Sequence, residues 1–193
     1  MRVSILSFSG RSGGNCGRIA QEIRRFWRDR GEAEVYDFST FTVTPCGGCG
    51  YVCFQERECC PYMDDPVAGL FQAVTDSGLA YYVVPNYCDY PCANYFIFNE
   101  RSQCYFQGRP RLLEQYLAVR KKFIVVSNTG RDNFTAAFRY QLEENVEPEV
   151  LFLSAKQFHK VSVRGDIMDS AKARETLQSF IHQEEKYDRQ DHS

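Results

Sequence analysis

The chain of 193 residues lacks any apolar run close to the ~20 residues that a membrane-spanning helix needs. Its first residues also lack the longer apolar core and the small-residue cleavage site of a secretory signal peptide. Neither charge is in excess, because 23 basic residues stand against 25 acidic ones for a formal net charge of −2. We therefore expect a cytoplasmic protein with no membrane and no nucleic-acid partner.

Cysteine is too scarce for a disulfide scaffold, since nine in 193 residues is about 5%, below the roughly 8–10% typical of such proteins. Cytoplasmic thiols stay reduced, so clustered cysteines are better read as metal ligands or redox groups. The length suits one domain with a single core. We assign residues 1–183 to that domain, with a cysteine-rich insertion at 45–65, and expect the polar tail 184–193 to fray.

Short segments rich in apolar and aromatic residues alternate with helical patterns along the chain. The predicted strands are residues 3–8, 33–38, 79–84, 122–127 and 149–153. Apolar residues at helical spacing follow each of them except the second, where the cysteine-rich segment comes first. Such alternation predicts an α/β fold, a five-stranded parallel sheet in the order 2-1-3-4-5 with helices on both faces. In such sheets ligands bind beyond the carboxyl ends of the strands, beside strands 1 and 3.

The loop after the first strand reads Ser9-Gly10-Arg11-Ser12-Gly13-Gly14-Asn15-Cys16-Gly17 and leads directly into a helical pattern. Glycines let backbone N–H groups converge on an anion at the positive end of the helix, where Ser9, Ser12 and Asn15 can donate hydrogen bonds and Arg11 adds charge. The loop is not a Walker loop and lacks the spaced glycines of the dinucleotide fingerprint. It predicts a phosphate cradle, and the alternative is a flexible turn capped by Asn15.

Two further loops leave the same predicted edge. Pro85-Asn86-Tyr87-Cys88 follows the third strand, where Tyr87 offers an aromatic wall for a planar ring system. Asn128-Thr129-Gly130 follows the fourth strand and offers amides to the polar rim of such a ring. Each loop on its own also fits an ordinary connecting loop. The argument for a cofactor site is that both loops lie at the same edge of the predicted sheet. The predicted cofactor-binding residues are Ser9, Arg11, Ser12, Gly14, Asn15, Cys16, Pro85, Asn86, Tyr87, Cys88, Asn128, Thr129 and Gly130.

Residues 1–130 resemble the flavodoxin-like FMN-binding NAD(P)H-dependent reductases and multimeric flavodoxins. The segment 9–16 is similar to their Gly-Ser-Pro-Arg-x-x-Gly-Asn-Thr phosphate loop, and residues 84–87 are similar to their Ser-Pro-Val-Tyr flavin loop. The chain departs from the pattern at Cys16, where the family usually has Thr, and at Asn86. Without the Thr hydroxyl one side-chain contact to phosphate is weakened, although backbone N–H groups remain.

The resemblance implies a three-layer α/β/α sandwich that binds FMN and takes electrons from NAD(P)H for a small-molecule or protein acceptor. The flavin carries the chemistry, so no acid or base residue is expected to be catalytic. The resemblance also implies a homodimer or homotetramer. Residues 96–103 are either part of a subunit contact or a buried helix.

Five of the nine cysteines lie between positions 46 and 60. Zinc ribbons space their cysteine pairs by about 15–20 residues, whereas a compact run is closer to iron–sulfur ligation by four thiolates. The segment resembles the cysteine motif of iron–sulfur flavoproteins, whose Cys-x-x-x-Asp-Asp ending favours Cys60 over Cys59, although the gap between Cys49 and Cys53 is one residue longer than usual. The predicted ligands of a [4Fe–4S] cluster are Cys46, Cys49, Cys53 and Cys60.

Three interpretations of these cysteines remain open: a [4Fe–4S] cluster that relays electrons, a zinc or dithiol site, and a loop that only packs. The corresponding alternatives to an FMN-dependent reductase are a pure electron carrier and a non-enzymatic zinc or thiol sensor. Cys88 and Cys92 are either redox thiols near the flavin or packing residues, and Cys104 has the same two interpretations.

Overall fold

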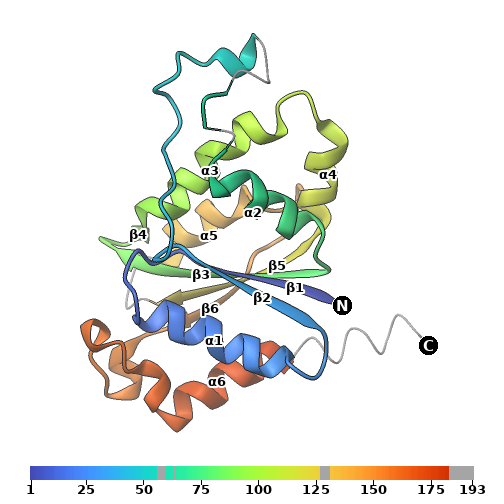
Figure 1. The fold of residues 1–193 in the computed structure, drawn as a ribbon. Helices are drawn as coiled ribbons and strands as arrows, with labels where there is room; N and C mark the ends of the chain where they lie inside the picture. Colours follow the sequence, from blue (N-terminus) through green and yellow to red (C-terminus); the bar gives the residue numbers. More distant parts are fainter. Residues whose placement is uncertain (56–59, 63, 127–130, 183–193) are drawn as a thin grey trace, which may run out of the picture.

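The computed structural model describes residues 1–55, 60–62, 64–126 and 131–182 (Figure 1). Five parallel strands pair in the order β2-β1-β3-β5-β6, which confirms the predicted 2-1-3-4-5 sheet. Their bounds are Arg2–Ser7 (β1), Glu32–Asp37 (β2), Leu79–Tyr87 (β3), Arg120–Val126 (β5) and Glu149–Leu153 (β6). A two-residue strand, β4 (Tyr90–Pro91), pairs antiparallel with the end of β3. The predicted tail, Cys59 and Ser127 lie outside the described residues.

Helices cover both faces of the sheet (Figure 1). One layer contains α1 (Asn15–Trp27) and α6 (Ala171–His182), and the other contains α2 (Pro66–Thr75), α3 (Ala93–Phe106), α4 (Pro110–Ala118) and α5 (Arg131–Arg139). The three-layer sandwich expected from the sequence is therefore present. Within the described part of the chain, no helix is both long and apolar enough to cross a membrane.

Strand β3 shows why the sheet forms where it does. Its first seven residues are buried, and such a continuous apolar run is typical of a central parallel strand covered on both faces. Because side chains alternate along a strand, Tyr81 and Val83 pack with α1 and α6, while Tyr82 and Val84 pack with α2 to α5. The two hydrophobic cores of the domain lie on opposite faces of this one strand.

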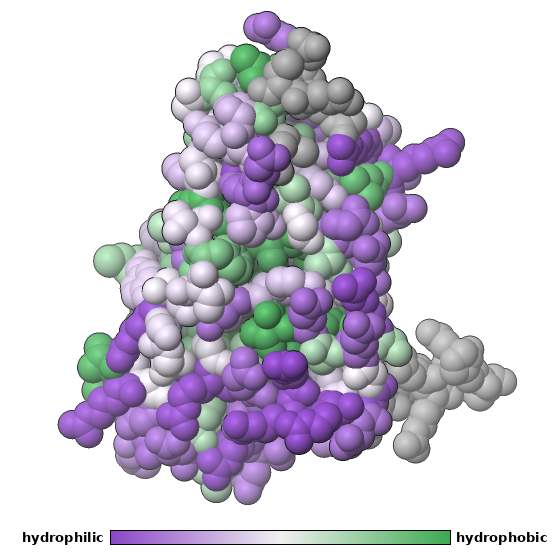
Figure 2. Space-filling view, viewed as in Figure 1, coloured by the Kyte–Doolittle hydropathy of each residue, from purple (hydrophilic) through white to green (hydrophobic). Residues whose placement is uncertain are grey.

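The layer of α1 and α6 presents a strongly polar surface. Hydrophilic side chains gather over it in Figure 2, and Arg24 and Arg25 of α1 and Arg28 just after it are exposed. The apolar side of α1 places Ile19, Ile23 and other residues of its helical stripe in the core. This agrees with the interpretation of the basic residues as a solvated helix face.

The predicted segment 96–103 lies within helix α3. Phe98 and Arg101 are buried, whereas Phe96 is 40% exposed. The helix is joined to α2 by stacked aromatic rings, with the centroids of Phe71 and Phe98 4.3 Å apart. The interpretation as a buried helix therefore holds for one side of α3, and a subunit contact through its exposed side stays a prediction.

Candidate cofactor site

The first element of the site is the β1–α1 loop at the carboxyl end of the sheet. Gly14 is the N-cap of α1 in an extended conformation (φ −76°, ψ 178°), and no side chain among the described residues caps the first-turn N–H groups. No acidic residue lies in the first turn. Gly13 has a φ of +66°, which favours glycine, and there is open space where its Cβ would be. Uncapped N–H groups at the positive end of a helix dipole form a binding place for an anion.

Three of the predicted phosphate ligands lie in this loop and differ in accessibility. Arg11 and Ser12 are exposed, so both can reach an anion bound at the start of α1. Ser9 is only 5% exposed, and its Oγ accepts a hydrogen bond from the backbone N–H of Arg11 at 3.1 Å. Ser9 therefore shapes the loop, while Arg11 and Ser12 provide its accessible polar groups.

Asn15 has a different role from the one predicted. Its Nδ2 donates to the carbonyl oxygen of Ser162 at 3.0 Å, and its Oδ1 accepts from the backbone N–H of Ile167 at 3.0 Å. Both polar atoms of this buried amide are thus engaged with the segment between β6 and α6. The side chain fastens that segment to the helix and leaves only its backbone N–H for a phosphate.

Cys16 likewise faces the interior. Its side chain is 2% exposed and packs in the core on the α1 and α6 side. Burial raises the pKa of the Cys16 thiol well above its usual range, and nearby Cys92 and Asp37 raise it further. The prediction that Cys16 binds the cofactor therefore holds at most for its backbone N–H.

The segment after β6 closes against the back of the loop, which the sequence did not reveal. Gly165 has a φ of +73°, and a Cβ there would lie 3.0 Å from the carbonyl oxygen of Gly13. The guanidinium of Arg18 donates to the carbonyl oxygen of Gly165 at 2.7 Å and pairs with Asp169. The pairing with Arg18 lowers the pKa of Asp169. In the sequence, the one local sign of this contact is that Gly165 lies between two charged residues.

The second element of the site is the hairpin of β3 and β4. Cys88 and Asp89 have φ values of 53° and 65°, so both central residues of the turn are left-handed, as in a type I′ turn. The Oδ1 of Asn86 accepts from the N–H of Asp89 at 2.8 Å. The Nδ2 of Asn133 in α5 donates to the carbonyl oxygen of Asp89 at 3.0 Å. These bonds fix a turn that glycine would adopt more easily.

The hairpin displays two aromatic side chains. Tyr87 and Tyr90 are paired across the two strands, and they are 57% and 54% exposed. Pro85 is buried and lies opposite Val126 at the end of β5. The predicted aromatic wall therefore lies at the carboxyl edge with the rings of Tyr87 and Tyr90 open to solvent.

A shared acceptor joins the hairpin to the β1–α1 loop. The carbonyl oxygen of Phe8 accepts from the Nδ2 of Asn94 at 3.0 Å and from the Sγ of Cys92 at 3.3 Å. A Cβ on Gly10 would lie 3.6 Å from Asn94 Nδ2. Burial raises the pKa of Cys92 to about 11, so this thiol is a structural donor. The first and second predicted loops thus meet, and the third, with Asn128, Thr129 and Gly130, lies outside the described residues.

The predicted iron–sulfur ligands are not gathered around one point. Among the described residues, which include Cys46, Cys49, Cys53 and Cys60, no group of three or more His, Cys, Asp or Glu side chains is arranged to hold a metal ion. Cys53 and Cys60 are buried against Cys104 of α3, whereas Cys46 and Cys49 are partly exposed. The arrangement does not support a site built from the four predicted ligands.

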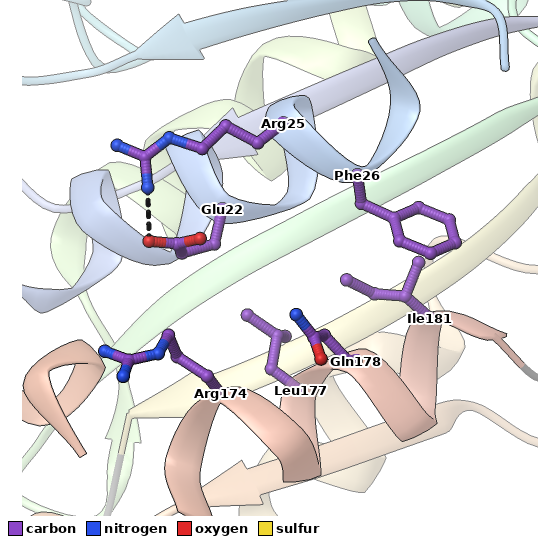
Figure 3. A pocket seen from close by; sticks show the side chains of 7 residues that line it. All are labelled: Glu22, Arg25, Phe26, Arg174, Leu177, Gln178 and Ile181. Carbon is purple, nitrogen blue, oxygen red and sulfur yellow. Dashed lines mark hydrogen bonds and ion pairs between the residues drawn. The ribbon is translucent and has the colours of Figure 1, made fainter. Parts of the chain in front are cut away.

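A cavity of about 210 Å³ lies elsewhere, between α1 and α6 (Figure 3). Phe26 and Ile181 form its apolar end, and Glu22 and Arg25 pair at its rim with 2.5 Å between Oε1 and Nη1. Its lining includes no residue of the β1–α1 loop or of the hairpin. The cavity is a helix-packing groove separate from the candidate site.

No protein-family model matches the chain, and no curated protein matches it in sequence. Solved structures do match. RosB, with bound 8-demethyl-8-formylriboflavin-5'-phosphate, has a TM-score of 0.65 and 10% identity over 94% of this chain and 76% of its own. The Trp repressor binding protein of Bacillus subtilis has a TM-score of 0.57 and 12% identity over 92% and 95%. The azoreductase AzrA has a TM-score of 0.55 and 8% identity over 93% and 99%.

The chain has the flavodoxin-like fold. At 8–12% identity these matches establish the arrangement of strands and helices alone.

Proposed function

We propose that the protein is an FMN-dependent oxidoreductase that takes electrons from NAD(P)H. The observation that carries this proposal is the uncapped N-terminus of α1, opened by Gly13 and Gly14, at the point where the strand order reverses between β1 and β3. The hairpin with exposed Tyr87 and Tyr90 is tied to the same loop. An anion-binding helix end beside an aromatic surface fits a phosphorylated planar ring.

The chain offers a separate group for each part of FMN. The first-turn N–H groups of α1, with Ser12 and Arg11, would hold the phosphate, and Arg11 would offset part of its negative charge. Tyr87 or Tyr90 would cover one face of the ring. When bound, the flavin would supply the transfer of electrons between NAD(P)H and an acceptor. The hydrogen bonds from Cys92 and Asn94 to Phe8 would keep the loop and the hairpin in register.

Two of the structural neighbours support this choice of cofactor and chemistry. RosB was solved with a riboflavin-5'-phosphate derivative, and AzrA is an azoreductase. Both share the fold that brings the two loops together here. An iron–sulfur relay is not part of the proposal, because the described cysteines do not form a metal-binding group.

The decisive experiment compares the binding of FMN and riboflavin to Gly14→Asp and Gly14→Asn. The extended conformation of Gly14 is open to any residue, and its Cβ would lie 3.3 Å from the carbonyl oxygen of Arg11, a contact that must relax slightly in both variants. Both side chains cap the helix, and only Asp adds a negative charge. Two negative charges about 5 Å apart, one on the Asp side chain and one on the phosphate, repel each other by about 3 kcal/mol at an effective dielectric constant near 20. This repulsion weakens binding by a factor of roughly 100.

We expect FMN to bind Gly14→Asp at least ~100-fold more weakly than Gly14→Asn, with riboflavin binding equal in the two variants because it has no phosphate. Flavin fluorescence quenching or calorimetry would measure the four affinities. Equal FMN affinities for the two variants would show that the phosphate does not lie at this helix end. Absence of FMN binding to the unchanged protein would overturn the proposed function itself.

A further inference from the structure

A buried thiol cluster lies where the cysteine-rich segment meets α3. Cys53, from the short 3-10 helix η1 (Val52–Phe54), Cys60 and Cys104 are 3%, 7% and 2% exposed and pack together, with Tyr62 against them. Figure 1 shows this segment leaving the sheet after β2 and running along α3 to the outer side of that helix layer. Cys104 lies far from the other two in sequence, so spacing gave no sign of this cluster.

Within the cluster, Cys60 and Cys104 are direct partners. They pack in one buried cluster, where burial raises the pKa of the Cys60 thiol and the nearby Cys104 raises it further. The Sγ of Cys104 donates to the carbonyl oxygen of Arg101 at 3.3 Å. Two thiols that pack together need only a small rotation and approach to reach the sulfur–sulfur bond length of a disulfide. The pair is therefore placed for direct oxidation.

The backbone around the pair is held in place without any covalent link. The guanidinium of Arg101, itself 2% exposed, donates to the carbonyl oxygens of Thr44 at 3.0 Å and Tyr62 at 2.6 Å, and it pairs with Asp65. The carboxylate of Glu100 accepts from the N–H of Cys46 at 3.3 Å. Helix α3 thus holds the segment on both sides of Cys60, which keeps Cys60 opposite Cys104.

The cation beside the pair also suits thiol chemistry. Burial alone would lower the pKa of Arg101, and its pairing with Asp65 raises it instead. Burial raises the pKa of the Cys60 thiol, and the positive charge of Arg101 opposes that rise, so it favours the thiolate that reacts in disulfide formation. Its Nε is buried with no hydrogen-bond partner among the described residues, so one donor next to the cluster remains open.

We propose that Cys60 and Cys104 form a reversible disulfide that ties the cysteine-rich segment to α3 in response to hydroperoxides. The sulfur of Cys60, the more exposed of the two, attacks a peroxide oxygen, breaking the O–O bond and leaving a sulfenic acid and one water from hydrogen peroxide. The sulfur of Cys104 then attacks the sulfenic sulfur and expels a second water. Two electrons pass from the sulfurs to the peroxide, and both thiol protons leave in water. This pair does not depend on flavin binding.

The test maps disulfides in the full chain after treatment with hydrogen peroxide, followed by denaturation, alkylation of free thiols, proteolysis and mass spectrometry. We expect one peptide pair joined through Cys60 and Cys104, lost on reduction, and at least ~10-fold less alkylation of both residues. Cys53→Ser and Cys88→Ser should retain the joined pair, and Cys104→Ser should lose it. Cys88 is the matched control because its thiol is exposed and outside the cluster.

Disulfides that join Cys60 to any other cysteine, or full alkylation of Cys60 and Cys104 after oxidation, would overturn the proposal. So would stoichiometric iron in protein purified without oxygen and lost in Cys60→Ser, because a thiolate bound to a cluster is not a free redox partner. The mapping on the unchanged protein decides the matter even if Cys104→Ser does not fold.

Discussion

Arg101→Met should destabilise the protein through the contacts that hold the cysteine-rich segment. The guanidinium bonds two backbone carbonyls and Asp65, and it lies over the ring of Tyr62 with 5.3 Å to the centroid. Removing it leaves the Asp65 carboxylate, 14% exposed, with one remaining partner among the described residues, the backbone N–H of Val67 at 3.0 Å. The same carboxylate caps α2, so the change also loosens the start of that helix.

The expected loss follows from the buried charge that is left behind. Breaking a buried ion pair by removing one partner costs about 3–5 kcal/mol, and the apolar packing of methionine recovers about 1 kcal/mol of this. We expect a loss of about 3 kcal/mol in the free energy of unfolding, or roughly 6–12 °C in melting temperature for a domain of this size. Circular dichroism during urea and thermal unfolding would measure both.

A second substitution separates charge from packing. Asp65→Asn keeps an oxygen that can cap α2 and removes the negative charge, so adding it to Arg101→Met should restore about 1–2 kcal/mol. A loss below ~1 kcal/mol in Arg101→Met, or a double variant no more stable than the single one, would refute the view that Arg101 and Asp65 form a coupled buried pair.

Three further outcomes are expected. Replacing Cys88 and Asp89 with Asn and Gly should raise stability by about 1 kcal/mol in thermal unfolding, because both positions have positive φ. Burial lowers the pKa of Lys121 to about 7 from 10.5. Above pH 7 the unfolded state therefore binds more protons at this lysine than the folded state does. The free energy of unfolding should therefore rise by about 2–3 kcal/mol between pH 7 and 9, and Lys121→Met should abolish this rise in urea titrations. Gly165→Ala should cost about 1–2 kcal/mol and weaken FMN binding more than riboflavin binding in titrations, because its Cβ would lie 3.0 Å from the Gly13 carbonyl oxygen.

The sheet was predictable because its strands are defined by local apolar runs. The predicted segment 149–153 coincides with β6, and the other strands differ by a few residues at their ends. The extension of β3 into a hairpin was not predicted, since Cys88 and Asp89 are not the Asn-Gly pair typical of such turns. Tertiary contacts from Asn133 stabilise the turn instead.

The parts of the candidate site that depend on backbone conformation were predictable from the sequence. The parts that depend on side-chain contacts between distant segments of the chain were less predictable. The glycines of the β1–α1 loop leave the helix end open as expected. Asn15 binds a segment about 150 residues away, and the packing of Cys60 with Cys104 depends on the position of α3. The burial of Arg101 was not predicted, because an arginine is rarely buried unless it is paired and its partner Asp65 lies in another part of the chain.

The most direct test of the central claim is the visible absorption spectrum of the protein as purified and after incubation with FMN, with the released flavin identified and NAD(P)H then added without oxygen. FMN should be present or taken up in stoichiometric amount, and its oxidised absorption band should bleach on addition of the nucleotide. Protein that neither contains flavin nor takes up FMN would contradict the account, because the open helix end beside the tyrosine hairpin would then serve some other anion.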